Sequence, residues 1–181
     1  MSEIKVNKIK SQQGSNAFTI ASDGGVTYET SLAVTGGNPA WRIGRATDQN
    51  FTTSGSYLKA EWDNTDDSVE NIFMQNVTYS SGLITVPVAG IYQINATVRL
   101  DGLTADSGYA IVTIRRNQIN TNLADTYNLR EPNNASYATY HVSDIFKADA
   151  NDTFSVYVYS SNDTSWHINA NVSVFSGAKI G

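Results

Sequence analysis

The stretch Asn76-Val-Thr-Tyr79-Ser-Ser-Gly82-Leu-Ile84-Thr-Val86-Pro87-Val-Ala-Gly90-Ile-Tyr92-Gln-Ile94 predicts three β-strands separated by two tight turns. Ser81-Gly82 supplies the first reversal, because glycine adopts positive φ without a steric penalty. Pro87 ends the second strand, since proline has no N–H to donate to a neighbouring strand. Gly90 then turns the chain into the third strand.

Beyond Gly90, apolar and polar residues alternate up to Leu100, which is the pattern of a half-buried strand. Similar short runs follow at residues 109–115, 137–146, 154–159 and 166–175, and one precedes at 41–45. Many short strands with turn signals between them predict an all-β sandwich or barrel. Residues predicted to fill its core are Tyr92, Ile94, Val98, Phe154, Val156, Val172 and Val174.

Composition excludes several classes of protein. The net charge of −5 argues against nucleic acid as the main partner, because phosphate binding requires clustered Lys and Arg. The nearest basic pair, Arg115-Arg116, is interpreted as a solvated strand end. The chain has no cysteine, so packing or assembly must hold it without disulfides. No window is apolar enough to predict a membrane span.

Residues 1–38 differ from the rest of the chain. Ser22-Asp-Gly-Gly25 is a hairpin or turn signal between apolar residues, and Thr35-Gly-Gly-Asn-Pro39 is typical of a linker. A segment with so few apolar residues cannot bury a core of its own. We therefore expect an N-terminal β segment at 1–38 that attaches or oligomerises, followed by one domain at 39–181.

The signature stretch resembles the C1q/TNF-like jelly-roll family, in which an Asn and an aromatic residue precede a Gly and a V-P-x-x-G-x-Y run follows. Two later features match as well: Asn151-Asp152 stands where the family has a Gly-Asp turn, and Phe175-Ser-Gly177 matches its closing Phe-x-Gly. The resemblance covers about residues 39–181. It implies a jelly-roll sandwich, a compact homotrimer, and a binding protein that is not an enzyme.

The N-terminal segment resembles the start of many virion and tail-fibre proteins of tailed phages. The shared features are the opening Met1-Ser-x-Ile4-x-Val6-Asn7 and the motif Ile20-Ala-Ser-Asp-Gly-Gly-Val26. The expected function is a phage virion structural protein, a trimeric fibre, spike or decoration, whose jelly-roll knob binds the host surface. Residues 1–38 would attach it to other virion proteins. No signal peptide opens the chain, so synthesis in the host cytoplasm is expected. The alternative is a free lectin-like or receptor-type binding module.

Aromatic side chains are the candidate binding residues. Tyr157 and Tyr159 lie on the strand face opposite Phe154. The resemblance implies that such aromatics line a trimer axis; the alternative is a sugar-stacking surface. Tyr92 is a further candidate for the trimer interface, although the alternation also places it in the core. Trp41, Trp62 and Trp166 are candidates for ligand stacking, with core or interface as the default interpretation.

No catalytic or cofactor site is expected. His141 and His167 are the only histidines, both lie in alternating strands, and a surface or interface role is favoured over general base catalysis. Asp63, Asp66 and Asp67 cluster in a polar loop, where calcium binding is conceivable because hard cations prefer clustered oxygens. Their spacing fits no EF-hand, so a solvated acidic turn is the favoured interpretation.

Overall fold

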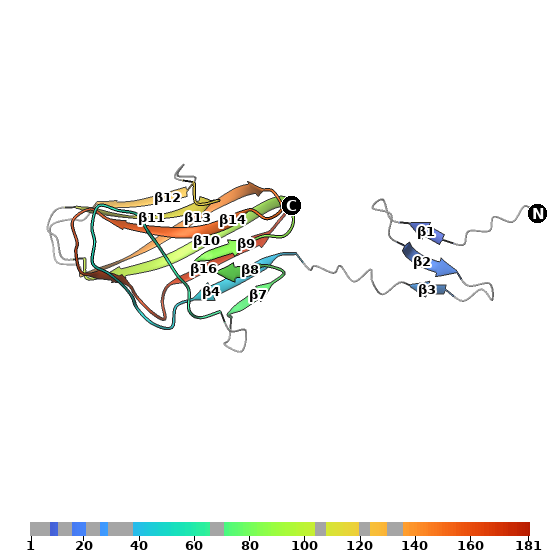
Figure 1. Ribbon diagram of the computed structural model, residues 1–181, viewed down its shortest axis with the longest axis horizontal. Helices are drawn as coiled ribbons and strands as arrows, with labels where there is room; N and C mark the ends of the chain where they lie inside the picture. The colour runs from blue at the N-terminus through green and yellow to red at the C-terminus, as the bar shows by residue number, and fades with distance from the viewer. Residues whose placement is uncertain are drawn as a thin grey trace, which may run out of the picture. The chain divides into compact units, whose positions relative to one another are not determined.

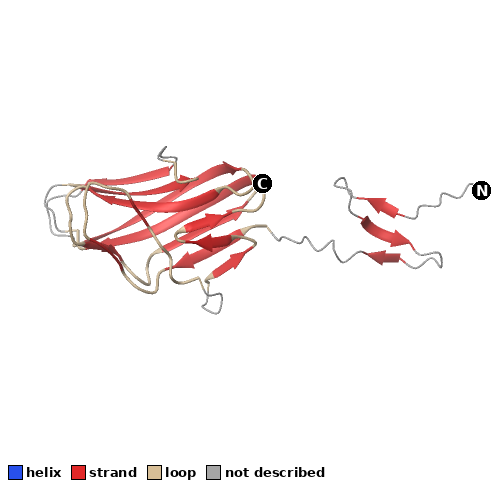
Figure 2. Cartoon of the chain, in the orientation of Figure 1, coloured by secondary structure: helices blue, strands red, loops and turns tan. Residues whose placement is uncertain are grey.

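The computed structural model describes residues 8–10, 16–20, 26–28, 38–65, 71–103, 108–119, 124–129 and 136–181. The chain divides into two compact units, Met1–Gly37 and Asn38–Gly181. The elements drawn in both units are strands joined by loops (Figures 1 and 2). In the described ranges, no helix is long and apolar enough to cross a membrane.

The first unit contains a three-stranded antiparallel sheet. Its strands are β1 (Lys8–Lys10), β2 (Asn16–Ile20) and β3 (Val26–Tyr28), in the order β1-β2-β3. Ile20 of β2 pairs with Val26 of β3, and the predicted turn at Ser22–Gly25 lies outside the described residues.

The second unit is an all-β fold built of two antiparallel sheets. The first, called the β10 sheet below, comprises β4 (Ala40–Gly44), β5 (Gln49–Phe51), β7 (Phe73–Gln75), β10 (Gly90–Asp101), β13 (Tyr137–Ala148), β15 (Trp166–Ile168) and β16 (Val174–Lys179). β10 pairs with β13 along one edge and with β16 and then β15 along the other. β4 pairs with β16, and β5 pairs with β15.

The second layer is called the β14 sheet. It comprises β6 (Leu58–Lys59), β8 (Thr78–Ser80), β9 (Leu83–Thr85), β11 (Tyr109–Arg116), β12 (Ala124–Leu129) and β14 (Thr153–Ser160). The order is β12-β11-β14-β9-β8. β6 pairs with β14 beyond the end of β9, so that one long edge of β14 is covered by two short segments from different parts of the chain.

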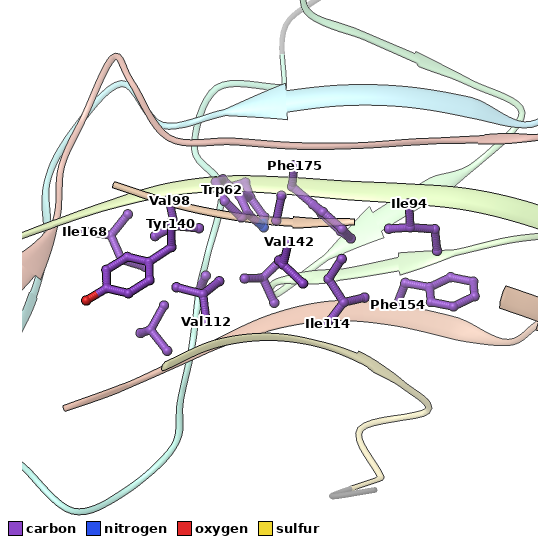
Figure 3. Packing of buried hydrophobic residues seen from close by; sticks show 14 of the residues in the cluster. Trp62, Ile94, Val98, Val112, Ile114, Tyr140, Val142, Phe154, Ile168 and Phe175 are labelled. Carbon is purple, nitrogen blue, oxygen red and sulfur yellow. The ribbon is translucent and has the colours of Figure 1, made fainter. Parts of the chain in front are cut away.

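The core lies between the two sheets, where their inward side chains interdigitate (Figure 3). Tyr92, Ile94, Val98, Phe154 and Val156 are fully buried, which confirms their predicted positions. Alternation along β10 and β14 explains this, since every second residue must face the opposite sheet. Aromatic rings fill the centre of the cluster and contact one another edge-on or stacked; they include Trp41, Trp62, Tyr92, Phe146, Phe154 and Phe175.

The predicted register of the last strand is wrong after Ile168. Val172 is 44% exposed and Val174 is half-buried, whereas Phe175 is fully buried. The expected single strand at 166–175 is two strands, β15 and β16. Between them Asn171 takes φ 63° and Val172 donates its N–H to Ala170 O at 2.8 Å. This turn shifts the alternation by one residue, and such a shift moves every later side chain to the other face.

Four of the predicted turn and closing residues have clear physical roles. Ser81 and Gly82 take φ values of 47° and 80°, and Asn151 takes φ 72°, a conformation that Asn tolerates. Gly177 pairs with Trp41 across β16 and β4, and a Cβ at this position would lie 2.4 Å from the Trp41 ring. The closing Phe-x-Gly is therefore a packing requirement, because only glycine leaves room for the indole.

Candidate functional site

The outward face of the β14 sheet is rich in tyrosine. On β14 the side chains of Phe154, Val156 and Val158 enter the core, so Tyr157 and Tyr159 point away from it. Tyr157 pairs with Thr113 on β11 and with Lys59 on β6. These cross-strand neighbours share its face of the sheet.

Three tyrosine rings form a row across this face. The ring centroids of Tyr57 and Tyr159 are 5.1 Å apart, and those of Tyr159 and Tyr109 are 5.4 Å apart. The last pair is nearly parallel, with an interplanar angle of 18°. All three side chains are half-buried, so the row combines contact among the rings with partial exposure to solvent.

Arg115 lies beside this row. Its guanidinium carbon is 4.3 Å from the centroid of the Tyr57 ring and 4.2 Å from that of Tyr157. Both distances fit cation–π contacts. The residue is only 5% exposed, and its Nε and Nη2 are buried without a hydrogen-bond partner. We call Tyr57, Tyr109, Arg115, Tyr157 and Tyr159 the tyrosine–arginine surface.

The buried guanidinium is incompletely satisfied. Its cross-strand neighbour on β14 is Ser155, whose Oγ is also buried without a hydrogen-bond partner. Among the described residues no carboxylate lies within ion-pairing distance of Arg115. A buried donor without an acceptor costs about 1–3 kcal/mol, and more when it is charged. The contacts with Tyr57 and Tyr157 offset only part of that cost.

The outward face of the β10 sheet has a different character. Ser143 donates its hydroxyl to Asn95 Oδ1 at 2.6 Å, and Thr97 Oγ1 lies 2.9 Å from His141 Nδ1. Arg99 donates from Nε and Nη2 to the two carboxylate oxygens of Asp101, at 2.7 and 3.1 Å. Cross-strand and neighbouring partners therefore satisfy these polar groups within the subunit.

The structure separates the aromatic residues proposed from the sequence. Tyr157 and Tyr159 belong to the tyrosine–arginine surface, as their strand phase predicts. Tyr92 is fully buried and donates its hydroxyl to Val88 O at 2.7 Å. Burial raises the pKa of Tyr92 above its ordinary value. Its side chain therefore has no surface left for contact with another subunit, and it belongs to the core.

The three tryptophans also belong to the core. Trp41, Trp62 and Trp166 are 1%, 2% and 2% exposed, so none presents a ring face on which a sugar could stack. Trp166 packs on Phe51 with ring centroids 4.6 Å apart and donates its Nε1 to Thr53 O at 2.9 Å. The default interpretation holds for all three.

Asp63 has a structural role. Its carboxylate accepts hydrogen bonds from the backbone N–H groups of Ala46 and Thr47 at 2.7 and 3.1 Å, and Arg45 Nη2 lies 3.6 Å away. Partial burial alone would raise the pKa of Asp63, but the bonds from Thr47 and Ala46 and the charge of Arg45 outweigh it and lower the pKa.

The other two carboxylates of the suggested calcium site, Asp66 and Asp67, lie outside the described residues. Within those residues, no group of three or more His, Cys, Asp or Glu side chains is placed to hold a metal ion. The calcium hypothesis therefore stays a prediction.

Sequence reasoning missed the most informative residue of the surface. The pair Arg115-Arg116 was interpreted as a solvated strand end, yet Arg115 is buried and only Arg116 is substantially exposed. The alternation along β11 places Arg115 on the same face as Tyr109, and that was the available signal. Tyr57 had no such signal, because the run at 56–62 does not alternate cleanly.

No model of a known protein family matches the chain, and a comparison with curated proteins finds no match either.

Proposed function

We propose that this protein is a non-enzymatic structural and binding protein of a phage particle. Its second unit is a trimeric jelly-roll knob that binds a host-surface glycan through the tyrosine–arginine surface. Residues 1–38 attach it to other virion proteins. The observation that carries the binding function is the row of half-exposed tyrosine rings beside a buried arginine on the outer face of the β14 sheet.

The order of the strands supports a jelly roll. One sheet contains the order β4-β16-β10-β13, and the other contains β9-β14-β11-β12. The chain passes from β9 to β10, from β10 to β11, from β12 to β13 and from β13 to β14 by changing sheets each time. Eight strands that alternate in this way between two sheets form the interlocked Greek keys of a jelly roll.

The surface is suited to sugars. Tyrosine combines a large apolar ring face with a polar tip, and it is enriched where a ligand must be contacted partly dry and partly wet. Tyr57, Tyr159 and Tyr109 lie in a row, in contact with one another and half-buried, so an extended chain of sugar rings that follows the row fits better than a compact ligand.

Glycan binding by the full chain tests this function. A glycan array identifies the ligand, and titration then compares the parent with Tyr159→Ser. We expect an affinity loss of about tenfold, because one aromatic contact contributes about 1 kcal/mol beyond its buried area. Tyr137→Ser is the matched control, since Tyr137 is 52% exposed but belongs to the other sheet. An equal loss in both variants would contradict the assignment.

Particle attachment has a separate test. A chain that begins at Asn38 retains both sheets of the second unit. Supplied during phage growth in place of the full protein, it should be missing from purified virions, as assayed by mass spectrometry. Normal incorporation of the shortened chain would place attachment in the second unit. Absence of the full-length protein from particles would favour the free lectin-like module.

A further inference from the structure

We propose that the ligand of the tyrosine–arginine surface is an acidic glycan and that Arg115 binds its carboxylate. This inference rests on the proposed glycan-binding function and specifies the substrate class of that same site. Four observations carry it: the unsatisfied guanidinium, its contrast with the next residue, the weak attachment of the ring that covers it, and the chemistry of the surrounding face.

The first observation is the state of the guanidinium. Arginine presents a planar fork of donors that matches a carboxylate in a bidentate arrangement. In Arg115 the Nε and Nη2 positions of that fork are buried and lack acceptors. A carboxylate brought by a ligand would supply both missing acceptors at once, in a setting of low dielectric where a charged hydrogen bond is strong.

The second observation is the contrast with Arg116, the next residue of β11. Arg116 Nε lies 3.7 Å from Asp152 Oδ2, and Arg116 also donates from Nη1 to Lys147 O. Among the described residues, a carboxylate and a carbonyl thus lie beside the more exposed arginine, and no acid lies beside the more buried one. Structural stability alone gives no reason for that distribution, because the buried charge has the greater need of a partner.

The third observation concerns access. Tyr157 lies over the guanidinium, and its hydroxyl donates to Gln118 Oε1 at 3.5 Å, the limit of a hydrogen bond. Gln118 itself is exposed in the turn after β11. Rotation of the Tyr157 ring would break this long bond and the contact of the ring with the guanidinium, and it would remove one of the two rings that cover the fork. The displaced ring would remain beside the bound sugar as a stacking partner.

The fourth observation is the chemistry of the face. Lys59, the cross-strand partner of Tyr157, adds a second cation. The large exposed hydrophobic side chains of the described residues are Phe73, Met74, Val88, Ile119, Tyr137, Ile145, Val172 and Ile180. None of them belongs to β6, β11 or β14. Among the described side chains of β6, β11 and β14, the combination of tyrosines and cations without exposed aliphatic groups fits an acidic sugar better than a second protein, whose interface core would be more apolar.

The test is a set of titrations with the full-length protein. The probes are oligosaccharides of galacturonic, mannuronic, guluronic and sialic acid, each paired with its neutral methyl ester. We expect at least one acid to bind about tenfold or more tightly than its own ester, as a charge-assisted hydrogen bond predicts. The difference should shrink at high salt, because ionic strength screens it.

Two variants locate the effect. Arg115→Met should remove the preference for the acid over the ester while thermal melting shows a folded protein. Arg99→Met is the matched control and should leave the preference unchanged, because Arg99 stacks on Tyr137 in the other sheet and is already paired with Asp101. The pairwise comparison of acid and ester in the parent needs no variant, so it remains informative if Arg115→Met fails to fold.

The outcomes separate the two proposals. Equal binding of every acid and its ester overturns the role of Arg115 but leaves a glycan-binding surface. A preference for acids that survives Arg115→Met also overturns it. Binding of none of these probes, with no glycan bound on the array, overturns the proposed function as well. Loss of the oligomer in Tyr157→Glu, without any glycan binding by the parent, would assign the surface to a second copy of this chain instead.

Discussion

The two outer faces of the sandwich use arginine in opposite ways. On the β10 sheet Arg99 lies 4.2 Å from the centroid of the Tyr137 ring and holds both carboxylate oxygens of Asp101. On the β14 sheet Arg115 contacts two tyrosine rings at similar distances, yet its Nε and Nη2 have no acceptor. Among the described residues, the arginine stacked on tyrosine therefore has a carboxylate partner on the β10 sheet and none on the β14 sheet.

This difference teaches how a binding surface can be distinguished from an ordinary solvated face. Polar side chains on the β10 sheet form hydrogen bonds with one another, as Ser143 does with Asn95. Their hydrogen-bonding groups therefore need few further partners from solvent. A surface that awaits a ligand keeps buried donors without acceptors, as Arg115 does. Such donors lower stability in the free protein, and the proposed ligand binding is the reason to retain them.

The largest change in the free energy of unfolding is expected for the core between the two sheets. Phe154→Ala should lower the free energy of unfolding by about 3–5 kcal/mol, as is typical for a buried aromatic residue. Phe154 is fully buried and contacts the rings of Trp41, Tyr92 and Phe146. Denaturant unfolding followed by tryptophan fluorescence measures this change. A loss below about 1 kcal/mol would contradict the packing of the two sheets.

Assembly provides the next test of the comparison between the faces. We expect the parent to be a trimer by light scattering at micromolar concentration. Exposed aliphatic side chains gather on or next to the β10 sheet, among them Ile145 at 60% exposure and Ile180 at 54%. Subunit interfaces bury such groups, so Ile145→Glu should yield a smaller species and Tyr157→Glu should not. A smaller species in Tyr157→Glu but not in Ile145→Glu would place the tyrosines at the trimer contact. A parent protein that is monomeric at this concentration would contradict the trimer.

The two stacked arginines should differ in their effect on stability. Arg115→Met removes a buried charge with unsatisfied donors and keeps an unbranched side chain between the rings, so we expect an increase of about 1 kcal/mol in the free energy of unfolding. Arg99→Met breaks an ion pair that is partly exposed, and a small decrease in the free energy of unfolding follows. Paired thermal melts measure both. A strong destabilisation by Arg115→Met would make Arg115 a structural residue.

The stability of the protein at acid pH should depend on the carboxylates that accept hydrogen bonds and contact cations within the chain. Burial alone would raise the pKa of Asp152, but the hydrogen bonds from Asn117 and Asp149 and the charge of Arg116 outweigh it and lower the pKa. A lowered folded-state pKa means that this stabilisation is complete above the unfolded value of about 3.9 and is lost as the pH falls through the folded value.

Melting temperature should therefore drop between about pH 5 and about pH 2, and the drop should be smaller in Asp152→Asn. Asp63, whose pKa is also lowered, should contribute in the same direction, so the double variant should flatten the profile further. An unchanged acid profile in Asp152→Asn would mean that its bonds to β11 are not maintained in solution.

The smallest effect is expected for the polar pairs of the β10 sheet. Ser143→Ala removes the hydrogen bond to Asn95 on an exposed face and should cost about 0.5 kcal/mol, with no change in glycan binding. Chemical denaturation measures the change in the free energy of unfolding, and the glycan titrations measure the change in affinity. A loss of glycan affinity in this variant would show that the β10 sheet, rather than the tyrosine–arginine surface, meets the ligand.

Much of the fold follows from local sequence chemistry. The sequence pattern identified β10, β11 and β14 as strands, and alternation identified buried residues of β10 and β14. The turn at Ser81-Gly82 was evident from glycine alone. The register of β16 was not evident from the sequence, because apolar and polar residues keep alternating through Asn171 while the backbone turns there. The contacts that fix this turn come from distant parts of the chain, among them the Asn171 N–H with Arg45 O and the Ala170 N–H with Asp48 Oδ1.

The candidate site was only half accessible to sequence reasoning. Strand phase identified Tyr157 and Tyr159 as outward residues. Tyr57 reaches them because its segment runs along β14 beyond the end of β9, a long-range pairing that no local pattern records. The burial of Arg115 depends on that same pairing, since Tyr57 is one of the two rings beside it. Residue type alone does not distinguish a core ring from a binding ring, as the buried Trp41, Trp62 and Trp166 illustrate.

The most direct measurement is an NMR titration that observes the Nε–H resonances of Arg99 and Arg115 in the same sample of the full-length protein. The ligand is the acidic oligosaccharide that binds most tightly, and its methyl ester is the control. If the tyrosine–arginine surface binds the carboxylate, the Arg115 resonance shifts with the acid and not with the ester, while the Arg99 resonance stays in place. A shift of Arg99, or an Arg115 resonance that responds equally to acid and ester, would contradict this assignment.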